Sequence, residues 1–161
     1  MTTREIVLCS PVRTAIGTYA GSLKELAAPA LGAAVIRATL ARAGLAGDKV
    51  EALVMGNVIQ AGVRMNPARQ AGIGAGLPVE VPARTVNRGC GSGAQGIVSA
   101  ALEVGAGMID CAVAGGMENM DRAPYLLPQG RWGARMGDVT LLDSMLYDGL
   151  NDAFSGQHSG W

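Results

Sequence analysis

The chain has 161 residues, the size of one domain, and a formal net charge of zero at pH 7, so charge gives no case for nucleic acid or a membrane surface as a partner. Apolar residues make up 49% and aromatic residues only 4%, which predicts a core of Ala, Val, Leu, Ile and Met. The three cysteines do not have the spacing of metal ligands, which predicts a reducing compartment and no metal site. No apolar run is long enough for a signal peptide or a membrane span. We therefore expect a cytoplasmic protein.

The first part of the chain predicts a strand, a loop and a helix. Ile6–Ser10 is an apolar run typical of a buried strand, and it would place Cys9 in the core. Residues 11–27 are rich in turn residues and predict a loop. A helix is expected to carry Pro29 in its first turn and to end at Gly44. Its expected apolar face consists of Leu31, Val35, Ala38 and Leu40.

The middle of the chain alternates between strand and helix patterns. Val50–Met55 predicts a strand, and Asn66 followed by Pro67 is typical of a helix start that ends near residues 76–78. Residues 84–86 predict the next strand, and residues 91–104 predict a helix of small residues that is buried on all sides. Met108–Ala114 predicts a further strand, with Cys111 in the core. This order predicts an α/β fold, a mostly parallel sheet with helices on both faces, over residues 1–118.

The composition changes after Gly116, so residues 119–161 are expected to form a separate, loop-rich part. Proline and glycine interrupt the pattern there, Thr140–Tyr147 predicts a helix, and residues 150–161 predict a loop. Trp132 lies among several arginines, which fits either a cationic site for a phosphorylated ligand or an interface loop with aromatic and arginine anchors. The arginines are Arg122, Arg131 and Arg135.

The segment at residues 85–93, TVNRGCGSG, contains the strongest candidate for chemistry. Cys90 follows a short strand and stands where a helix would begin, beside unpaired N–H groups and the positive end of the helix dipole, which favour a thiolate. Flanking glycines let another molecule approach the sulfur. Cys90 is therefore a candidate nucleophile, with an inert, buried cysteine as the alternative.

A second interpretation of the same segment is a dinucleotide site. Gly91, Gly93 and Gly96 fit the pattern G-x-G-x-x-G between a strand and a helix, and Glu118 after the next strand would bind the ribose. This interpretation leaves Cys90 without a role.

Five segments in the same order resemble motifs of the thiolase family. TVNRGCGSG resembles its nucleophile segment T-V-N-[KR]-x-C-G-S-G, and VRTAIG at residues 12–17 resembles V-R-T-P-x-G. GNVIQAG at 56–62, followed by NPARQ at 66–70, resembles G-N-V-x-Q-A-G…N-P-A-R-Q. AGGMENM at 114–120 and DGLNDAF at 148–154, followed by His158, resemble A-G-G-M-E-S-M and D-G-L-x-D-A-F…H-M-G.

The resemblance implies roles for named residues. Cys90 would be the acyl-accepting nucleophile, and Leu150 and His158 would lie beside the pantetheine of acyl-CoA. Ser159 stands where the family commonly has Met, which leaves the shape of the acyl pocket open. Arg69 and Gln70 would be architectural and lie near a dimer contact. The segment around Trp132 would be the tetramerisation loop of a homo-oligomer, dimer or tetramer.

Thiolases consist of two similar α/β halves with a loop domain inserted in the first, so these residues would be the first repeat and the start of that loop domain. The family also uses a histidine of a G-H-P motif, a second cysteine of a C-x-G-G-G motif and an N-E-A-F segment, and none of these occurs here. We therefore expect a C-terminal half to complete the site as a second polypeptide, from a nicked chain or a separate subunit.

The function that these residues predict is a thiolase that condenses two acyl-CoA molecules or runs the reverse thiolysis. CoA thioesters would be small-molecule substrates, with no bound cofactor and no metal. The alternatives are a non-catalytic thiolase-like subunit or scaffold and, on the glycine pattern, a nucleotide-binding domain.

Overall fold

A three-stranded parallel sheet forms the centre of the computed structural model, which describes residues 4–160. Its strands are β1 (Ala52–Gly56), β2 (Ala83–Val86) and β3 (Ala112–Gly116), in the order β2-β1-β3. β1 pairs with β2 from Leu53 to Gly56 and with β3 along its whole length. The predicted α/β fold with a parallel sheet is confirmed, although β1 and β3 begin later than expected and the sheet has three strands instead of four.

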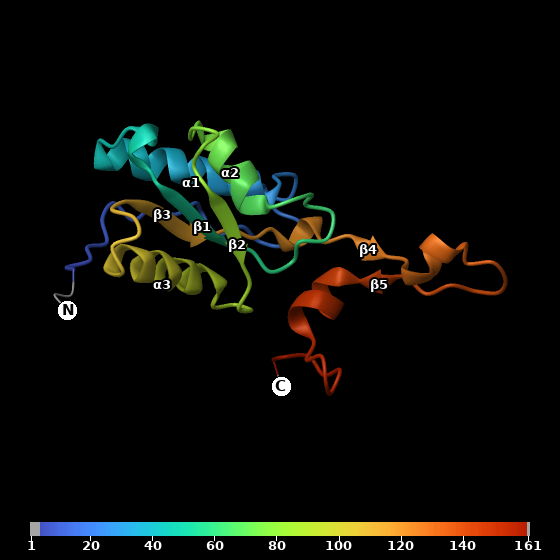
Figure 1. Cartoon of the computed structure of the whole chain (residues 1–161). Coiled ribbons are helices and arrows are strands. Elements are labelled where there is room, and N and C mark those ends of the chain that lie inside the picture. The colour runs from blue at the N-terminus through green and yellow to red at the C-terminus, as the bar shows by residue number, and fades with distance from the viewer. Residues whose placement is uncertain (1–3, 161) are drawn as a thin grey trace.

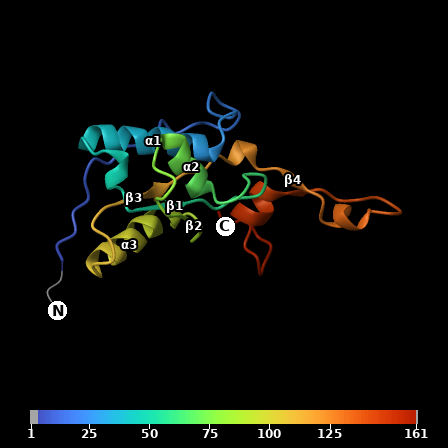
Figure 2. The ribbon, with the colours of Figure 1, turned by 45° about the horizontal axis from the view of Figure 1, so that its top comes forward.

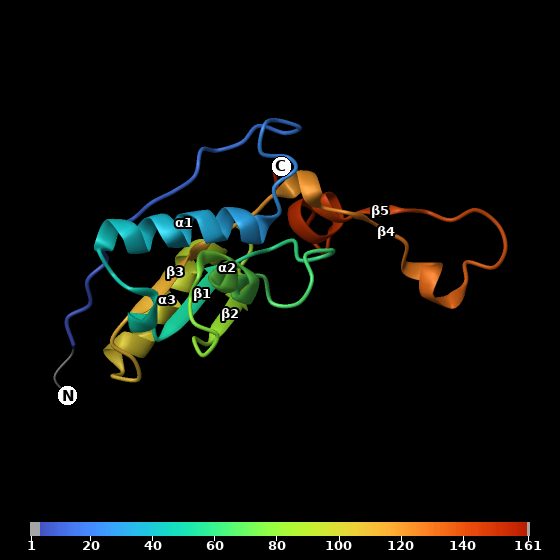
Figure 3. The same ribbon diagram turned by 90° about the horizontal axis from the view of Figure 1, so that it is seen from above.

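Helices cover both faces of the sheet, as predicted. α1 (Ala28–Ala43) and α2 (Pro67–Ala75) lie on one face and α3 (Ser92–Gly105) on the other (Figure 1). The apolar core lies mainly between the sheet and the pair α1 and α2, where Ile36, Leu53 and Met55 are almost completely buried. The view from above shows α1 lying across the strands (Figure 3).

Local signals set the ends of these helices. The side chain of Asn66 accepts a hydrogen bond from the N–H of Arg69 and so caps α2, and Pro67 follows in the first turn. Gly44 and Gly76 end α1 and α2 in the left-handed conformation, with φ of 62° and 90°. The predicted starts and stops are confirmed.

The buried stripe of α1 differs from the predicted one. Ala38 is exposed and Leu31 and Val35 are half-buried, so of the predicted face only Leu40 is buried. The helix instead turns Gly32 and Ile36 inward, because α2 packs closely at this point; a Cβ on Gly32 would lie 3.1 Å from that of Ala71. Small residues therefore decided which side of α1 faces the core.

The predicted strand Ile6–Ser10 is wrong. These residues form no strand, Val7 and Leu8 are about three-quarters exposed, and Cys9 is exposed instead of buried. Its polar contacts lie at or beside its ends, namely an ion pair between Arg4 and Asp110 and a hydrogen bond from Thr39 to the carbonyl of Ser10. An apolar run becomes a buried strand only where a neighbour pairs with it and a layer covers it, and residues 4–160 supply neither here.

The prediction that α3 is buried on all sides is also wrong. Its buried positions are Ser92, Gly96 and Ala100, which face the sheet. On the opposite side Val98 is about half exposed and Leu102 about two-thirds exposed, because no element within residues 4–160 packs over them. α3 therefore presents an uncovered apolar face.

Residues 119–160, called here the extension, project from the α/β part (Figures 1 and 2). β4 (Tyr125–Leu126) and β5 (Leu142–Asp143) pair antiparallel as its stem, and a loop with the short helix η3 (Pro128–Trp132) lies beyond them. The predicted helix Thr140–Tyr147 is wrong over its first half, because Leu142 and Asp143 form β5. A π-helical turn, η4 (Met145–Leu150), follows.

Residues 151–160 form turns without a helix, as predicted, and Trp161 lies outside the described residues. No helix in residues 4–160 is both long and apolar enough to cross a membrane.

Candidate active site

Close contact between glycines places the start of α3 directly on the carboxyl ends of β1 and β3. A Cβ on Gly56 would lie 2.6 Å from the backbone N of Gly93, and one on Gly116 would lie 2.9 Å from the Cα of Gly93. Side chains at these positions would push the helix away from the sheet. The first turn of α3 therefore lies where ligands bind in parallel α/β sheets.

A network of short-range hydrogen bonds closes the turn that carries Cys90. The Oγ of Ser92 accepts from the N–H of Arg88 and donates to the carbonyl of Gly89, at 2.8 and 2.6 Å. Asn87 accepts from the N–H of Gly89, whose φ of 54° lies in the left-handed region. Cys90 is exposed, two residues before the first residue of α3. This is the predicted position at the start of a helix.

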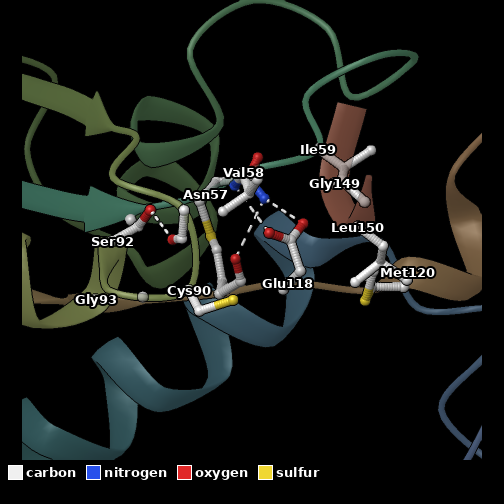
Figure 4. Close-up of a pocket in the computed structure, with 14 residues that line it drawn as sticks. Asn57, Val58, Ile59, Cys90, Ser92, Gly93, Glu118, Met120, Gly149 and Leu150 are labelled. Atoms are coloured by element: carbon white, nitrogen blue, oxygen red, sulfur yellow. Dashed lines mark hydrogen bonds between the residues drawn. The ribbon is translucent and has the colours of Figure 1, made fainter. Parts of the chain in front are cut away.

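Cys90 lines a cavity of about 390 Å³ at the carboxyl ends of the strands (Figure 4). The other walls come from Gly56–Ile59 after β1, from Gly116–Glu118 and Met120 after β3, and from Gly149–Leu150 in η4. Residues from four distant parts of the sequence thus enclose one space beside the sulfur.

Glu118 joins the ends of β1 and β3 at the middle of this cavity (Figure 4). Its two carboxylate oxygens accept hydrogen bonds from the Nδ2 of Asn57 and from the N–H of Val58, both at 2.8 Å. Burial raises the pKa of Glu118, and the bonds from Val58, Ile59 and Asn57 partly offset that rise. The carboxylate is thus already engaged by the protein and is a poor candidate for binding a ribose.

The glycine pattern behind the dinucleotide interpretation has another use in this structure. A Cβ on Gly96 would lie 2.9 Å from the carbonyl oxygen of Gly115 and 3.1 Å from that of Val54. Gly93 lies against Gly116 in the same way. These glycines bring the helix close to the sheet, and they leave Cys90 at the open end of the contact.

The structure brings two of the three predicted site residues to one cavity. Cys90 and Leu150 both line it, whereas His158 is not among the lining residues. His158 lies in a small loop closed by a bridge to Asn151, and its Nδ1 accepts from the N–H of Gly160. A ligand contact for His158 stays a prediction.

Sequence reasoning missed several lining residues, namely Asn57, Ile59, Met120 and Gly149. Asn57 and Ile59 directly follow β1, and Met120 lies shortly after β3. The rule that ligands bind beyond the carboxyl ends of parallel strands could have found these three. No local signal marked Gly149, because its place in the cavity depends on how the extension folds back.

The other two cysteines lie outside this cavity. Burial raises the pKa of Cys111, and the nearby Cys9 and Glu51 raise it further. Cys111 is half-buried just before β3, so the prediction of a core cysteine holds only in part. Within residues 4–160 no group of three or more His, Cys, Asp and Glu residues could hold a metal ion.

The three arginines of the extension do not form one cluster. Arg122 forms an ion pair with Glu25 at 3.8 Å, at the base of the extension. Arg131 and Arg135 lie in the loop beyond β4, where Trp132 is 79% exposed. Arg122 therefore lies apart from the loop that carries Arg131 and Arg135.

Comparisons with known proteins agree over nearly the whole chain. A family model described as "Thiolase, N-terminal domain" matches residues 6–161. Two Cupriavidus necator proteins are similar to the chain: an acetyl-CoA acetyltransferase, 49% identical over 97% of it, and the beta-ketothiolase BktB, 54% identical over 98%. An acetyl-CoA acetyltransferase of Pseudomonas aeruginosa is 48% identical over 98% of the chain. The chain spans 40% of the length of each of these relatives.

Proposed function

The chain belongs to the thiolase family, and on this premise we propose that it carries the nucleophile of an acyltransferase acting on acyl-CoA thioesters. The observation that supports this most is the position of Cys90, at the start of α3 and on a cavity at the carboxyl ends of β1 and β3. The relatives named acetyl-CoA acetyltransferases support the same chemistry.

In the proposed reaction the Cys90 thiolate attacks the thioester carbonyl carbon of acyl-CoA. A bond forms between that carbon and Sγ, the bond to the sulfur of CoA breaks, and CoA leaves as a thiolate that takes up a proton. The enolate of a second acetyl-CoA then attacks the acyl group, which gives a 3-ketoacyl-CoA and restores the Cys90 thiolate. Thiolysis is the reverse sequence, and the CoA thioesters are substrates, with no resident cofactor or metal.

Enolate formation needs a base and a site that stabilises the enolate oxygen. Cys90 is the one cysteine among the described residues that line the cavity, and no histidine lines it. We propose that a C-terminal half supplies these groups, as a second polypeptide from a nicked chain or a separate subunit. The uncovered apolar face of α3 supports this proposal, because a further half of the fold would cover it.

The oligomeric state, the cellular location and the metabolic role of the protein are part of the same proposal. The exposed loop around Trp132 supports a homo-oligomer, a dimer or a tetramer, because Trp and Arg are frequent anchors of interfaces. Three cysteines that form no disulfide support the cytoplasm, and the acyl-CoA substrates place the reaction in lipid metabolism.

The test is acylation of the complete assembly, this chain together with the C-terminal half. After incubation with acetyl-CoA, peptide mapping by mass spectrometry should find the acetyl group on Cys90. Cys90→Ala should abolish it, whereas the matched variant Cys9→Ala should keep it, because Cys9 is exposed and lies outside the cavity. Acetylation that persists elsewhere in Cys90→Ala would refute the assignment.

The alternative is a non-catalytic thiolase-like subunit. The observation that favours it is that no histidine and no second cysteine are among the residues of the described chain that line the cavity. An assembly that binds CoA thioesters with the same affinity in the wild type and in Cys90→Ala, and forms no acyl-enzyme, would support this alternative.

A further inference from the structure

Asn119 lies behind the wall that its two neighbours form in the cavity. Glu118 and Met120 line the cavity beside Cys90 (Figure 4), whereas Asn119 between them is not a lining residue. The backbone of Asn119 is extended, with φ of −142° and ψ of 100°, and successive side chains of an extended segment point to opposite sides. Asn119 therefore faces away from the cavity, toward residues 20–26, called here the clamp loop, which precede α1.

The side-chain amide of Asn119 joins the clamp loop to the base of the extension. Its Nδ2 donates to the carbonyls of Leu23 and Leu26, at 3.0 and 2.6 Å. Its Oδ1 accepts from the N–H of Asp121 at 3.1 Å and so caps the short helix η2 (Met120–Arg122). One side chain thus fixes the turn after β3 to the loop that leads into α1.

A second contact between the clamp loop and the extension is weaker. Arg122 and Glu25 form an ion pair at 3.8 Å, and their side chains are 48% and 80% exposed. Exposed ion pairs contribute little to stability, because water and salt screen them. Asn119 is half-buried, so water competes less with its hydrogen bonds and they carry most of the connection.

A third contact depends on the same amide. The N–H of Ala20 donates to the carboxylate of Asp121 at 2.7 Å, and Ala20 has a φ of 56°, in the left-handed region that favours glycine. This bond helps to hold the clamp loop in a conformation that is strained for alanine. Asp121 is itself held by Asn119, so loss of the amide weakens this contact as well.

The chain differs from the thiolase motif at this residue. The motif A-G-G-M-E-S-M has Ser where the chain has Asn119. A serine hydroxyl carries one hydrogen and can donate to one carbonyl, whereas the amide donates to two. The wall of the cavity is therefore anchored more firmly here than a serine would allow.

We propose that Asn119 is a positioning residue for the proposed reaction: it anchors the wall formed by Glu118 and Met120 to the clamp loop, and so fixes that wall relative to Cys90. The proposal rests on the proposed function and deepens it, because it names a residue outside the cavity on which the rate of acylation depends. Asn119 acts only through its two neighbours in the chain.

The first measurement is amide hydrogen exchange of the chain, followed by NMR. The N–H of Val58 donates to Glu118 and reports on the wall, whereas the N–H of Leu53 in β1 bonds to the carbonyl before β2 and reports on the sheet. Asn119→Asp keeps the acceptor oxygen but replaces the two donated bonds by a carboxylate that faces two carbonyls. Exchange at Val58 should become about tenfold faster, because two hydrogen bonds are lost, and exchange at Leu53 should not change.

Two further variants separate loss of the anchor from added charge and from unfolding. Asn119→Ser keeps one donor, so exchange at Val58 should become only about threefold faster. Gln129→Glu makes the same change from amide to acid at an exposed residue of the extension, and it is the control for the exchange measurement. If Asn119→Asp does not fold, Asn119→Ser decides alone.

The second measurement is acylation of the complete assembly by acetyl-CoA over a range of concentrations. Asn119→Asp should lower the rate at saturation about tenfold and leave the half-saturating concentration within about twofold, because a displaced wall disturbs the reacting geometry more than it disturbs binding. Asn119→Ser should lie between Asn119→Asp and the wild type. The final yield of acylated Cys90 should stay at the wild-type level, whereas a loss of folded protein would lower it.

Exchange that becomes faster at Val58 and Leu53 alike, or an Asn119→Asp chain that exchanges as Gln129→Glu does, would overturn the proposal. Acylation at the wild-type rate in Asn119→Asp would also overturn it and would leave the proposed function intact. If the wild-type assembly forms no acyl-enzyme while exchange at Val58 responds as expected, the proposed function fails and the anchor at Asn119 stands.

Discussion

The α/β part and the extension of this chain are built in opposite ways. In the α/β part, glycines bring α3 into backbone contact with β1 and β3, and apolar side chains between the sheet and α1 and α2 are almost completely buried. In residues 119–160 the one buried residue is Ser144, whose Oγ donates to the carbonyl of Pro124. Phe154 and Met136 are almost completely exposed there.

The difference shows which part of the cavity the chain can hold by itself. The turn around Cys90 and the bridge at Glu118 rest on the α/β part and are fixed by internal contacts. The wall at Gly149–Leu150 belongs to the extension, which has almost no core of its own. Large exposed apolar side chains mark binding surfaces, so we expect a partner to cover this part of the extension.

The largest expected effect concerns the loop of the extension. In the proposed tetramer, changing both Trp132 and Arg135 to Ala should give dimers, because buried Trp and Arg anchors typically contribute at least about 2 kcal/mol each to association. Size-exclusion chromatography with light scattering of the complete assembly measures the mass. Lys49→Ala, an exposed change in the α/β part, is the control. An unchanged mass in the double variant would mean that this loop forms no interface.

A smaller effect is expected from one and the same substitution at two places in α3. Gly96→Ala should lower the free energy of unfolding by about 1–3 kcal/mol, because the new methyl group would meet the carbonyls of Gly115 and Val54. Gly105→Ala should raise it by about 0.5–1 kcal/mol, because its Cβ would meet only Ile6 at an ordinary 3.4 Å and alanine favours a helix. Urea unfolding of the chain measures both. Equal effects at the two positions would contradict the close helix–sheet contact.

The smallest effect is a difference in titration between the two regions. Burial raises the pKa of Glu118 in the α/β part, whereas hydrogen bonds from the backbone and side chain of Ser155 lower the pKa of Asp152 in the extension. NMR titration of the carboxyl carbons, assigned with Glu118→Gln and Asp152→Asn, measures both. A Glu118 that titrates at or below the usual pH of a glutamate would contradict its burial.

These shifts act on stability in different pH windows. Glu118 holds its proton more tightly in the folded chain, so its contribution to the free energy of unfolding falls as pH rises from its unfolded pKa to its higher folded pKa. The contribution of Asp152 is present above its unfolded pKa and is lost as pH falls through its lower folded pKa. Urea unfolding at a series of pH values should therefore show opposite changes when each residue is replaced.

Sequence reasoning succeeded where a structure depends on neighbours in the chain. The cap at Asn66, the left-handed glycines that end α1 and α2, and the turn that carries Cys90 are set by residues a few positions apart. It failed where burial depends on distant segments. Ile6–Ser10 and the outer face of α3 have apolar sequences, yet nothing within residues 4–160 covers them.

Local patterns and ordered motifs were enough to identify the family, the alternation of strand and helix in a parallel sheet, and the place of Cys90 at the start of a helix. The folded chain was needed to show that Glu118 bridges the ends of β1 and β3, and that Ile59, Met120 and Gly149 meet across the cavity from Cys90. Those contacts join residues that lie far apart in the chain. Their geometry depends on how closely helix and sheet approach, and no local pattern records that distance.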